Sequence, residues 1–257
     1  MQTIKRPKFM LLDVKSNSDV GPSIEARFKN FTAADRSISE ATDLIYTWCF
    51  EHLAQESAIN AQQEFQHLTG KFFSDDDFYK VRIKYFIEYF LLDRLEKFSF
   101  LNHLTCPVYA FYQAPFFKSL PKEILHFLLE LRNSHHSLFQ VVNVNPKSLE
   151  IIDLLSENRN KISVQAAKNQ TFDGIEKADI FQCHIFKIDH SYLISDGLIL
   201  HSRKAAKTLL QMALDFNTNR RLTSLQFLFQ LANGQLMMVR RLSVSASYAY
   251  QALKLNS

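Results

Sequence analysis

The chain has 257 residues, of which 47% are hydrophobic and 22% charged, a balance typical of folded globular proteins and not of disordered ones. Phenylalanine is frequent with 23 copies, which predicts an aromatic core, and the formal net charge is +4. Only five glycines are present and none forms a G-x-G or G-x-x-x-x-G-K pattern, so the sequence excludes a dinucleotide-binding fingerprint and a P-loop.

The three cysteines, Cys49, Cys106 and Cys183, are far apart and form no C-x-x-C pair, so neither a disulfide framework nor a zinc ribbon is expected. The first residues, MQTIKRPKFMLLDVK, contain an apolar run too short for a signal peptide. No segment of the sequence approaches the roughly 20 apolar residues that a membrane helix needs. These features predict a cytoplasmic protein without a membrane span.

Residues 1–31 carry scattered Pro, Gly, Ser and Asn and are predicted to form an irregular arm or cap. A helical region is predicted over residues 32–134. Its first helix begins at Ser37, which has a glutamate at capping-box spacing. A second helix is predicted to begin at the SDDD stretch with Ser74 as its cap, and a third at Pro121.

From residue 135 the hydrophobic period changes from about 3.6 to about 2, which predicts strands over residues 135–201. The five expected strands are SLFQVVNV, SLEIIDLL, KISVQAA, DIFQCHIFKI and SYLISDGLIL. Residues 202–257 are predicted to be helical again, with Ser202 as a cap and a break at Asn233-Gly234. The predicted fold class is therefore α+β: an N-terminal helical layer, a five-stranded antiparallel sheet or small barrel, and C-terminal helices.

The hairpin predicted by the last two strands carries a cysteine and several histidines, which raises the question of a metal site. Alternate residues of a strand face opposite sides, so Cys183 and His184 cannot point the same way, and His190 and His201 fall at different ends of the hairpin. Because tetrahedral zinc needs four converging ligands, this hairpin alone cannot form such a site. These residues are predicted to be core and turn positions.

Two Glu-x-x-His pairs, Glu64 with His67 and Glu123 with His126, have the spacing found in carboxylate-bridged di-iron bundles. Such sites use inward-facing positions in mid-helix. Glu123 falls instead in the first turn of its predicted helix, and Glu64 lies in a polar stretch, NAQQEFQHLTG, that need not be core. No metal or other cofactor is therefore expected, and a metal-dependent enzyme is the third of three functional hypotheses.

Residues suited to nucleophilic catalysis are not arranged for it in the sequence. There is no G-x-S-x-G elbow, and Cys183 lacks the basic or helix-start environment that lowers a thiol pKa. His135 and His136 precede the first predicted strand and are predicted to be a solvated connector. The sequence therefore favours a protein that is not an enzyme.

Basic residues gather in the C-terminal part, where residues 202–257 hold eight basic residues and one acidic residue. This asymmetry predicts an anionic partner. The predicted partner- or anion-binding residues are Arg203, Lys204, Lys207, Arg220, Arg221, Arg240 and Arg241. Four apolar residues of the same part either form the centre of the interface or belong to the protein's own core: Phe227, Phe229, Met237 and Met238.

The leading hypothesis is a non-enzymatic interaction or regulatory module that binds a partner protein through this basic C-terminal region. The second hypothesis is nucleic-acid binding by the small β module and its basic flank, with an affinity that falls steeply with salt.

Three stretches of the chain are similar in order to a widespread family of uncharacterised bacterial proteins: YFIEYFLLDR, then LFQVVNVNPKSLEIIDLLSENRNKISV, then GIEKADIFQCHIFKIDHSYLISDGLILH. The resemblance covers roughly residues 83–205. It implies an aromatic-rich helix followed by a small barrel, and it implies no established activity. Ala178 stands where the pattern usually has glycine before Asp179, and the cysteine-rich zinc motif of some relatives is absent from this sequence.

Overall fold

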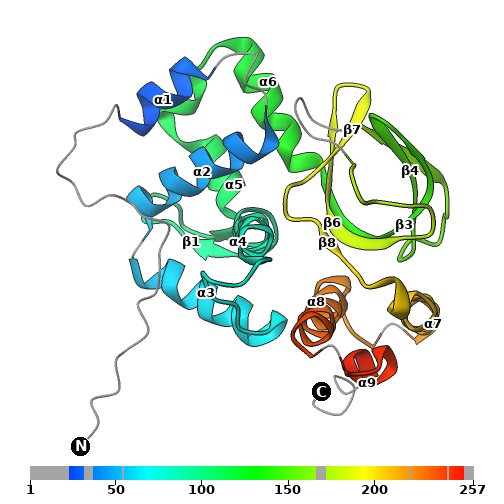
Figure 1. The fold of residues 1–257 in the computed structure, drawn as a ribbon. Helices are drawn as coiled ribbons and strands as arrows, with labels where there is room; N and C mark the ends of the chain where they lie inside the picture. Colours follow the sequence, from blue (N-terminus) through cyan, green and yellow to red (C-terminus); the bar gives the residue numbers. More distant parts are fainter. Residues whose placement is uncertain are drawn as a thin grey trace, which may run out of the picture.

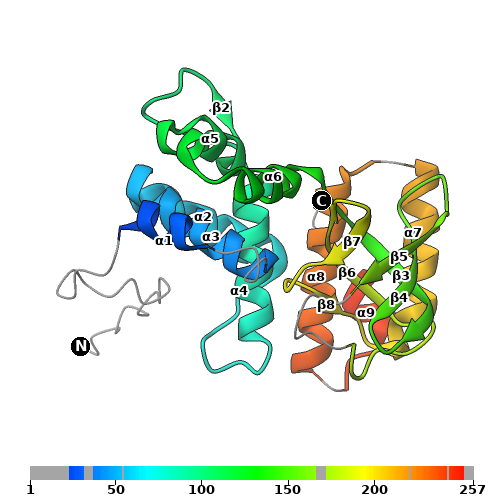
Figure 2. The ribbon, with the colours of Figure 1, turned by 90° about the horizontal axis from the view of Figure 1, so that it is seen from above.

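The computed structural model describes residues 23–31, 37–53, 55–165, 172–219, 221–241 and 243–251. It places a helical part on one side, and a β-barrel with the C-terminal helices on the other (Figures 1 and 2). The fold is α+β, as predicted. In the described residues no helix is both long and apolar enough to span a bilayer.

The helical part contains more elements than the sequence predicted. It consists of α1 (Ile24–Asn30), α2 (Ile38–His52), α3 (Gln55–Thr69), α4 (Tyr79–Glu88), the π-helix η2 (Tyr89–Asp93), the hairpin of β1 (Glu96–Lys97) and β2 (Leu104–Thr105), α5 (Pro107–Gln113), the 3-10 helix η3 (Pro115–Ser119), α6 (Lys122–Glu130) and the 3-10 turn η4 (Leu131–Asn133). Helix α1 lies within the segment predicted to be irregular. The polar stretch forms α3, and its Phe65 is fully buried.

The predicted helix caps were only partly right. The Ser37 hydroxyl accepts a hydrogen bond from the backbone N–H of Glu40, as predicted. Helix α4 begins later than predicted, at Tyr79, and its N-cap Phe78 makes no side-chain capping bond, so the Ser74 cap is wrong. Ser202 likewise makes no side-chain capping bond.

The β module is a closed barrel of β3 (Ser134–Asn145), β4 (Ser148–Asp153), β5 (Lys161–Gln165), β7 (Ser191–Ile194) and β6 (Ile180–Ile188), with β8 (Ile199–Leu200) added beside β6. All neighbouring pairs are antiparallel except β5 and β7, which are parallel. The barrel is therefore mixed, and the expectation of an antiparallel module was wrong in this detail. The reason is geometric, because a ring with an odd number of strands cannot alternate direction all the way round.

Alternation along β6 divides its side chains between two environments, as the sequence predicted. Phe181, Cys183 and Ile185 fill the barrel interior. His184 and Phe186 point from the outer face, and Phe186 packs within the core of the helical part. Within the helical part, helix α4 lies on the side that faces the barrel in both views (Figures 1 and 2). The outer face of β6 is thus the junction between the two halves of the fold.

The C-terminal helices are η5 (Arg203–Ala205), α7 (Ala206–Asn219), α8 (Ser224–Arg240) and α9 (Ala246–Gln251). Helix α8 runs straight through Gly234, so the predicted break there was wrong. A Cβ at Gly234 would lie 2.4 Å from Cδ1 of Tyr250. The glycine serves close packing of α9 on α8 instead of ending the helix.

Ala178 adopts a left-handed backbone conformation, with φ of 71°. This conformation costs an L-residue with a Cβ about 1 kcal/mol, a cost that glycine does not have. Because the Ala178 methyl is exposed, its removal loses no packing. We expect Ala178→Gly to raise the free energy of unfolding by about 0.5 kcal/mol, after the greater freedom of glycine in the unfolded chain is subtracted, and Ala178→Val to lower it. Urea denaturation of the three proteins checks this; a less stable glycine variant would contradict the strain.

Candidate functional site

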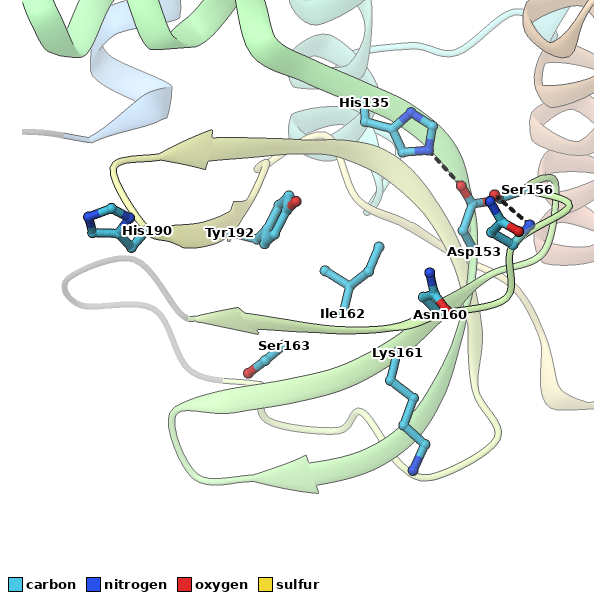
Figure 3. Close-up of a pocket in the computed structure, with 10 residues that line it drawn as sticks. His135, Asp153, Ser156, Asn160, Lys161, Ile162, Ser163, His190 and Tyr192 are labelled. Atoms are coloured by element: carbon cyan, nitrogen blue, oxygen red, sulfur yellow. Dashed lines mark hydrogen bonds and ion pairs between the residues drawn. The ribbon is translucent and has the colours of Figure 1, made fainter.

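The barrel opens beside β5. The parallel pairing of β5 with β7 consists of two residue pairs, Val164 with Tyr192 and Gln165 with Leu193. Among the described residues, the first half of β5 therefore has no partner strand on that side. A cavity of about 560 Å³ lies at this place. Its lining, drawn in Figure 3, consists of His135, Asp153, Ser156, Asn158, Asn160, Lys161, Ile162, Ser163, His190 and Tyr192. We call this cavity the barrel mouth.

Hydrogen-bond donors predominate in the barrel mouth, and the one carboxylate among its described lining residues is already engaged. Asp153 accepts hydrogen bonds from the Ser137 hydroxyl and the Leu155 backbone N–H, and its other oxygen lies 2.6 Å from Nε2 of His135. Burial opposes the charged form of this carboxyl, but the hydrogen bonds from His135 and Ser137 outweigh it and lower the pKa of Asp153. Figure 3 shows Tyr192 and Ile162 directed toward the middle of the mouth, with His190 at one end.

Basic residues flank the β4–β5 loop, which forms one wall of the mouth. Arg159 and Lys161 are exposed in and after this loop. The Asn217 side chain at the end of α7 donates a 2.9 Å hydrogen bond to the carbonyl of Leu154, where the loop begins. Arg221, four residues beyond Asn217, is exposed. The end of α7 therefore lies against the loop that borders the barrel mouth.

Two of the predicted partner-binding arginines make contacts within the chain. Arg203 pairs with the buried carboxylate of Asp179, at 2.6 Å from Nε, and with Glu176. Arg240 donates to Asp76 at 2.6 Å, and its guanidinium lies over the ring of Phe73. The remaining predicted residues Lys204, Lys207, Arg221 and Arg241 are exposed, and Arg220 lies outside the described residues.

The four apolar residues considered as an interface centre pack inside the protein. Phe227 and Phe229 are buried, and Met237 and Met238 pack against the core between the barrel and the C-terminal helices. They belong to the intramolecular core, which was the alternative considered for them.

The Glu-x-x-His pairs do not converge on a metal site. Glu64 accepts hydrogen bonds from the hydroxyl of Tyr89 and from Nε of Arg94, on the surface of the helical part. His126 contacts Asp189 in the β6–β7 turn at 3.0 Å. Throughout the described residues, one group of three side chains does bring metal-ligand atoms together, and neither pair contributes to it.

That group consists of Asp93, His136 and His184, which we call the junction cluster. Oδ2 of Asp93 lies 3.1 Å from Nδ1 of His136 and 3.3 Å from Nε2 of His184, and the two imidazole rings stack with centroids 4.0 Å apart. Asp93 ends the π-helix η2, and such helices recur at functional sites. The His136 side chain is only 7% exposed and lies on β3, so the prediction of a solvated connector was wrong for this residue. His135 is exposed as predicted but also belongs to β3.

The other nitrogen of each histidine also has an oxygen partner. Nδ1 of His184 lies 3.3 Å from Oε2 of Glu88, and Nε2 of His136 lies 2.9 Å from the hydroxyl of Tyr85. The second oxygen of Glu88 accepts from the backbone N–H of Gly197 at 3.0 Å. The cluster is thus surrounded by polar groups that fix both rings.

The pKa values of the two histidines are shifted in opposite directions. Burial disfavours charge on His184, but the carboxylates of Asp93 and Glu88 outweigh it and raise its pKa to about 9. Burial and the neighbouring His184 lower the pKa of His136 to about 4. Burial of the Asp93 carboxyl is outweighed by the two histidines, so its pKa lies well below the usual range.

A chain of buried hydrogen bonds continues from the cluster toward α9. The amide of Gln182 donates to the Tyr85 oxygen at 2.7 Å, and its carbonyl lies 3.2 Å from Nε2 of His201. Nδ1 of His201 lies 2.8 Å from the hydroxyl of Tyr250. The hydrogen bonds are consistent with one another when the Tyr250 hydroxyl donates to Nδ1 of His201 and Nε2 of His201 donates to Gln182. The ring then carries one proton, so the imidazole is neutral. Sequence periodicity placed these side chains on strands and helices but not next to one another.

No protein-family model matches this chain, and no curated protein or solved structure matches it either.

Proposed function

We propose that the barrel binds single-stranded nucleic acid at the barrel mouth. The observation that carries the proposal is the lining of the cavity, in which amide, hydroxyl and lysine donors accompany Tyr192, while the one carboxylate among the described lining residues is already occupied. Donors and positive charge suit phosphate and base edges, and aromatic rings suit base stacking.

The position of the mouth supports the same ligand. Asp153 ends β4, Lys161 begins β5 and His190 lies in the β6–β7 turn, so the mouth uses the second and third strands of the barrel and its last turn. Five-stranded barrels of the OB type bind oligonucleotides on the face of their second and third strands and on adjoining loops. The exposed Arg159 and Arg221 add a basic flank.

The test is fluorescence anisotropy with a labelled twelve-residue oligothymidylate or oligouridylate between 50 and 300 mM NaCl. If Arg159, Lys161 and Arg221 each neutralise one phosphate, log K should fall with log salt with a slope of about −2. Lys161→Glu should weaken binding roughly tenfold and make the slope shallower, while Tyr192→Leu should weaken binding by about 1–3 kcal/mol through loss of stacking. Oligonucleotide binding that does not depend on salt would contradict the proposal.

The matched control is Lys147→Glu. Lys147 is an exposed lysine in the β3–β4 turn, at the opposite end of β4 from Asp153, and the substitution makes the same charge change. Equal effects of Lys147→Glu and Lys161→Glu would mean that the oligonucleotide responds to overall charge and not to the barrel mouth.

Binding of a partner protein through the C-terminal region stays a prediction with less support. Its exposed basic residues are Lys204, Lys207, Arg221 and Arg241. The apolar centre that such an interface needs is lost, because Phe227 and Phe229 are buried in the core.

A further inference from the structure

The junction cluster lies away from the barrel mouth and carries an inference that does not depend on nucleic-acid binding. Its three side chains come from three different elements: Asp93 from η2, His136 from β3 and His184 from β6. We propose that Asp93, His136 and His184 bind a divalent transition metal ion of the zinc class. The ion would join the helical part of the protein to the barrel.

The spacing of the ligand atoms fits such an ion. Ligand atoms bound to one tetrahedral zinc ion at about 2.0–2.1 Å lie about 3.3 Å from one another. Oδ2 of Asp93 lies 3.1 Å from Nδ1 of His136 and 3.3 Å from Nε2 of His184. All three atoms lie within 4.8 Å of one another. Because an ion lies close to the plane of each imidazole that binds it, the two stacked rings, now 22° apart in plane angle, would have to tilt when the ion binds.

One nitrogen of the cluster lacks a hydrogen bond. The side chain of His184 is 1% exposed, and its Nε2 is a buried polar atom without a hydrogen-bond partner among the described residues, although Asp93 lies 3.3 Å away. The N–H therefore does not aim at the carboxylate oxygen. A buried nitrogen without a hydrogen-bond partner is costly, and an ion bound to this nitrogen and to the carboxylate would remove that cost.

The surrounding groups orient the two histidines as in known metal sites. Metal-bound histidines usually hold the other ring nitrogen on a carboxylate or another oxygen. Here Nδ1 of His184 contacts the Glu88 carboxylate, and Nε2 of His136 contacts the Tyr85 hydroxyl. When the proton of each ring lies on that nitrogen, the lone pairs of Nε2 of His184 and Nδ1 of His136 are free for the ion.

The donor set selects the class of ion. Two imidazoles with one carboxylate suit zinc, iron(II) or cobalt(II), whereas magnesium and calcium prefer all-oxygen sites. Three protein ligands leave a further coordination position for water or a small ligand. The Asp93 side chain is 20% exposed, against 7% for His136, so solvent reaches the cluster from the aspartate.

The test uses the full chain with its affinity tag removed. Elemental analysis of the purified protein should find about one zinc or iron per chain. After chelation and dialysis, hundredfold excess of zinc over its dissociation constant should raise Tm by about 5 °C, and calcium should not. Cobalt(II) should give visible absorption bands. Asp93→Asn and His184→Gln should abolish these responses, and Glu88→Gln should weaken zinc binding 10–100-fold.

The matched control is His135→Ala, one residue along β3 from His136, with a half-exposed side chain bound to Asp153. It should keep metal content, the Tm response and the cobalt bands. The proposal would be overturned if the wild-type protein contained no metal, showed no rise in Tm with zinc and gave no cobalt bands. This outcome does not depend on whether any variant folds. Metal binding that survives in a folded Asp93→Asn variant would overturn it as well.

Discussion

A Gln182→Leu variant is expected to unfold with a free energy about 3 kcal/mol below that of the wild-type protein. Gln182 is fully buried on the outer face of β6. Its amide donates to the Tyr85 hydroxyl at 2.7 Å and to the Leu228 carbonyl at 3.1 Å, and its carbonyl lies 3.2 Å from Nε2 of His201. Leucine fits the volume but satisfies none of these groups.

The largest part of this cost comes from His201. Tyr85 keeps His136 as a partner and Leu228 lies within helix α8, whereas Nε2 of His201 loses its acceptor inside the core. A buried donor without a partner costs about 1–3 kcal/mol, in addition to the lost hydrogen bonds themselves. Equilibrium urea denaturation at pH 7 in the presence of EDTA measures the difference.

Gln165→Leu provides the matched control, because it makes the same substitution at an exposed position of β5 in the same barrel. It should change the free energy of unfolding by no more than about 0.5 kcal/mol. If the two leucine variants were equally stable, the buried chain from Tyr85 to His201 would not stabilise the junction.

The sequence predicts the local elements of this fold well, because period-2 hydrophobicity is a local property. All five strands of the barrel were placed, and β6 was assigned its two faces. The fifth strand was predicted too long, because it ends at Ile194 and its predicted second half contains the separate short strand β8. Closure of the barrel was not predictable, since it depends on pairing β3 with β6 across two intervening strands. Helix α3 was missed because its composition is polar. Its Phe65 nevertheless packs against Tyr85, Phe86, Tyr89 and Phe229, which come from α4, η2 and α8.

The junction cluster shows the same limit for the site. His136 and His184 are direct partners in the pairing of β3 with β6, so a correct register would have brought these two histidines together. Asp93 could not be added from periodicity, because the wider π-helical turn at the end of α4 sets where it points. The metal sites considered from the sequence used one hairpin or residues three apart on a helix. The junction cluster instead takes one residue from each of three elements. Spacing along the chain is therefore a poor guide to sites at a junction.

A second large effect, after that of Gln182→Leu, is expected in acid, where the protein should lose stability because of His201. Burial, with the nearby positive charge of Arg82, lowers the pKa of His201 to about 3. The groups nearest its ring are the Tyr250 hydroxyl and the Gln182 amide, with the Arg82 guanidinium acting through its charge, and none of them carries a negative charge that would offset the cost of burying an imidazolium. The ring therefore stays neutral in the folded protein.

The direction of the pH effect follows from this difference. In the unfolded chain His201 has a pKa near 6.5, so between about pH 6.5 and pH 3 the unfolded state binds one proton more than the folded state. Stability from this residue is complete above pH 6.5 and is lost as the pH falls, by about 1.4 kcal/mol per pH unit. Below about pH 3 both states are protonated and the loss ends.

A His201→Gln variant isolates the effect, because glutamine remains polar and does not titrate. Urea denaturation of both proteins between pH 4.5 and 7, with EDTA present throughout, should give a slope of stability against pH that is shallower by one proton in the variant. Buried groups shared by both proteins, such as His136, cancel in this comparison. Equal slopes would mean that His201 gains its proton in the folded state, and that the chain from Gln182 to Tyr250 opens in acid before the protein unfolds.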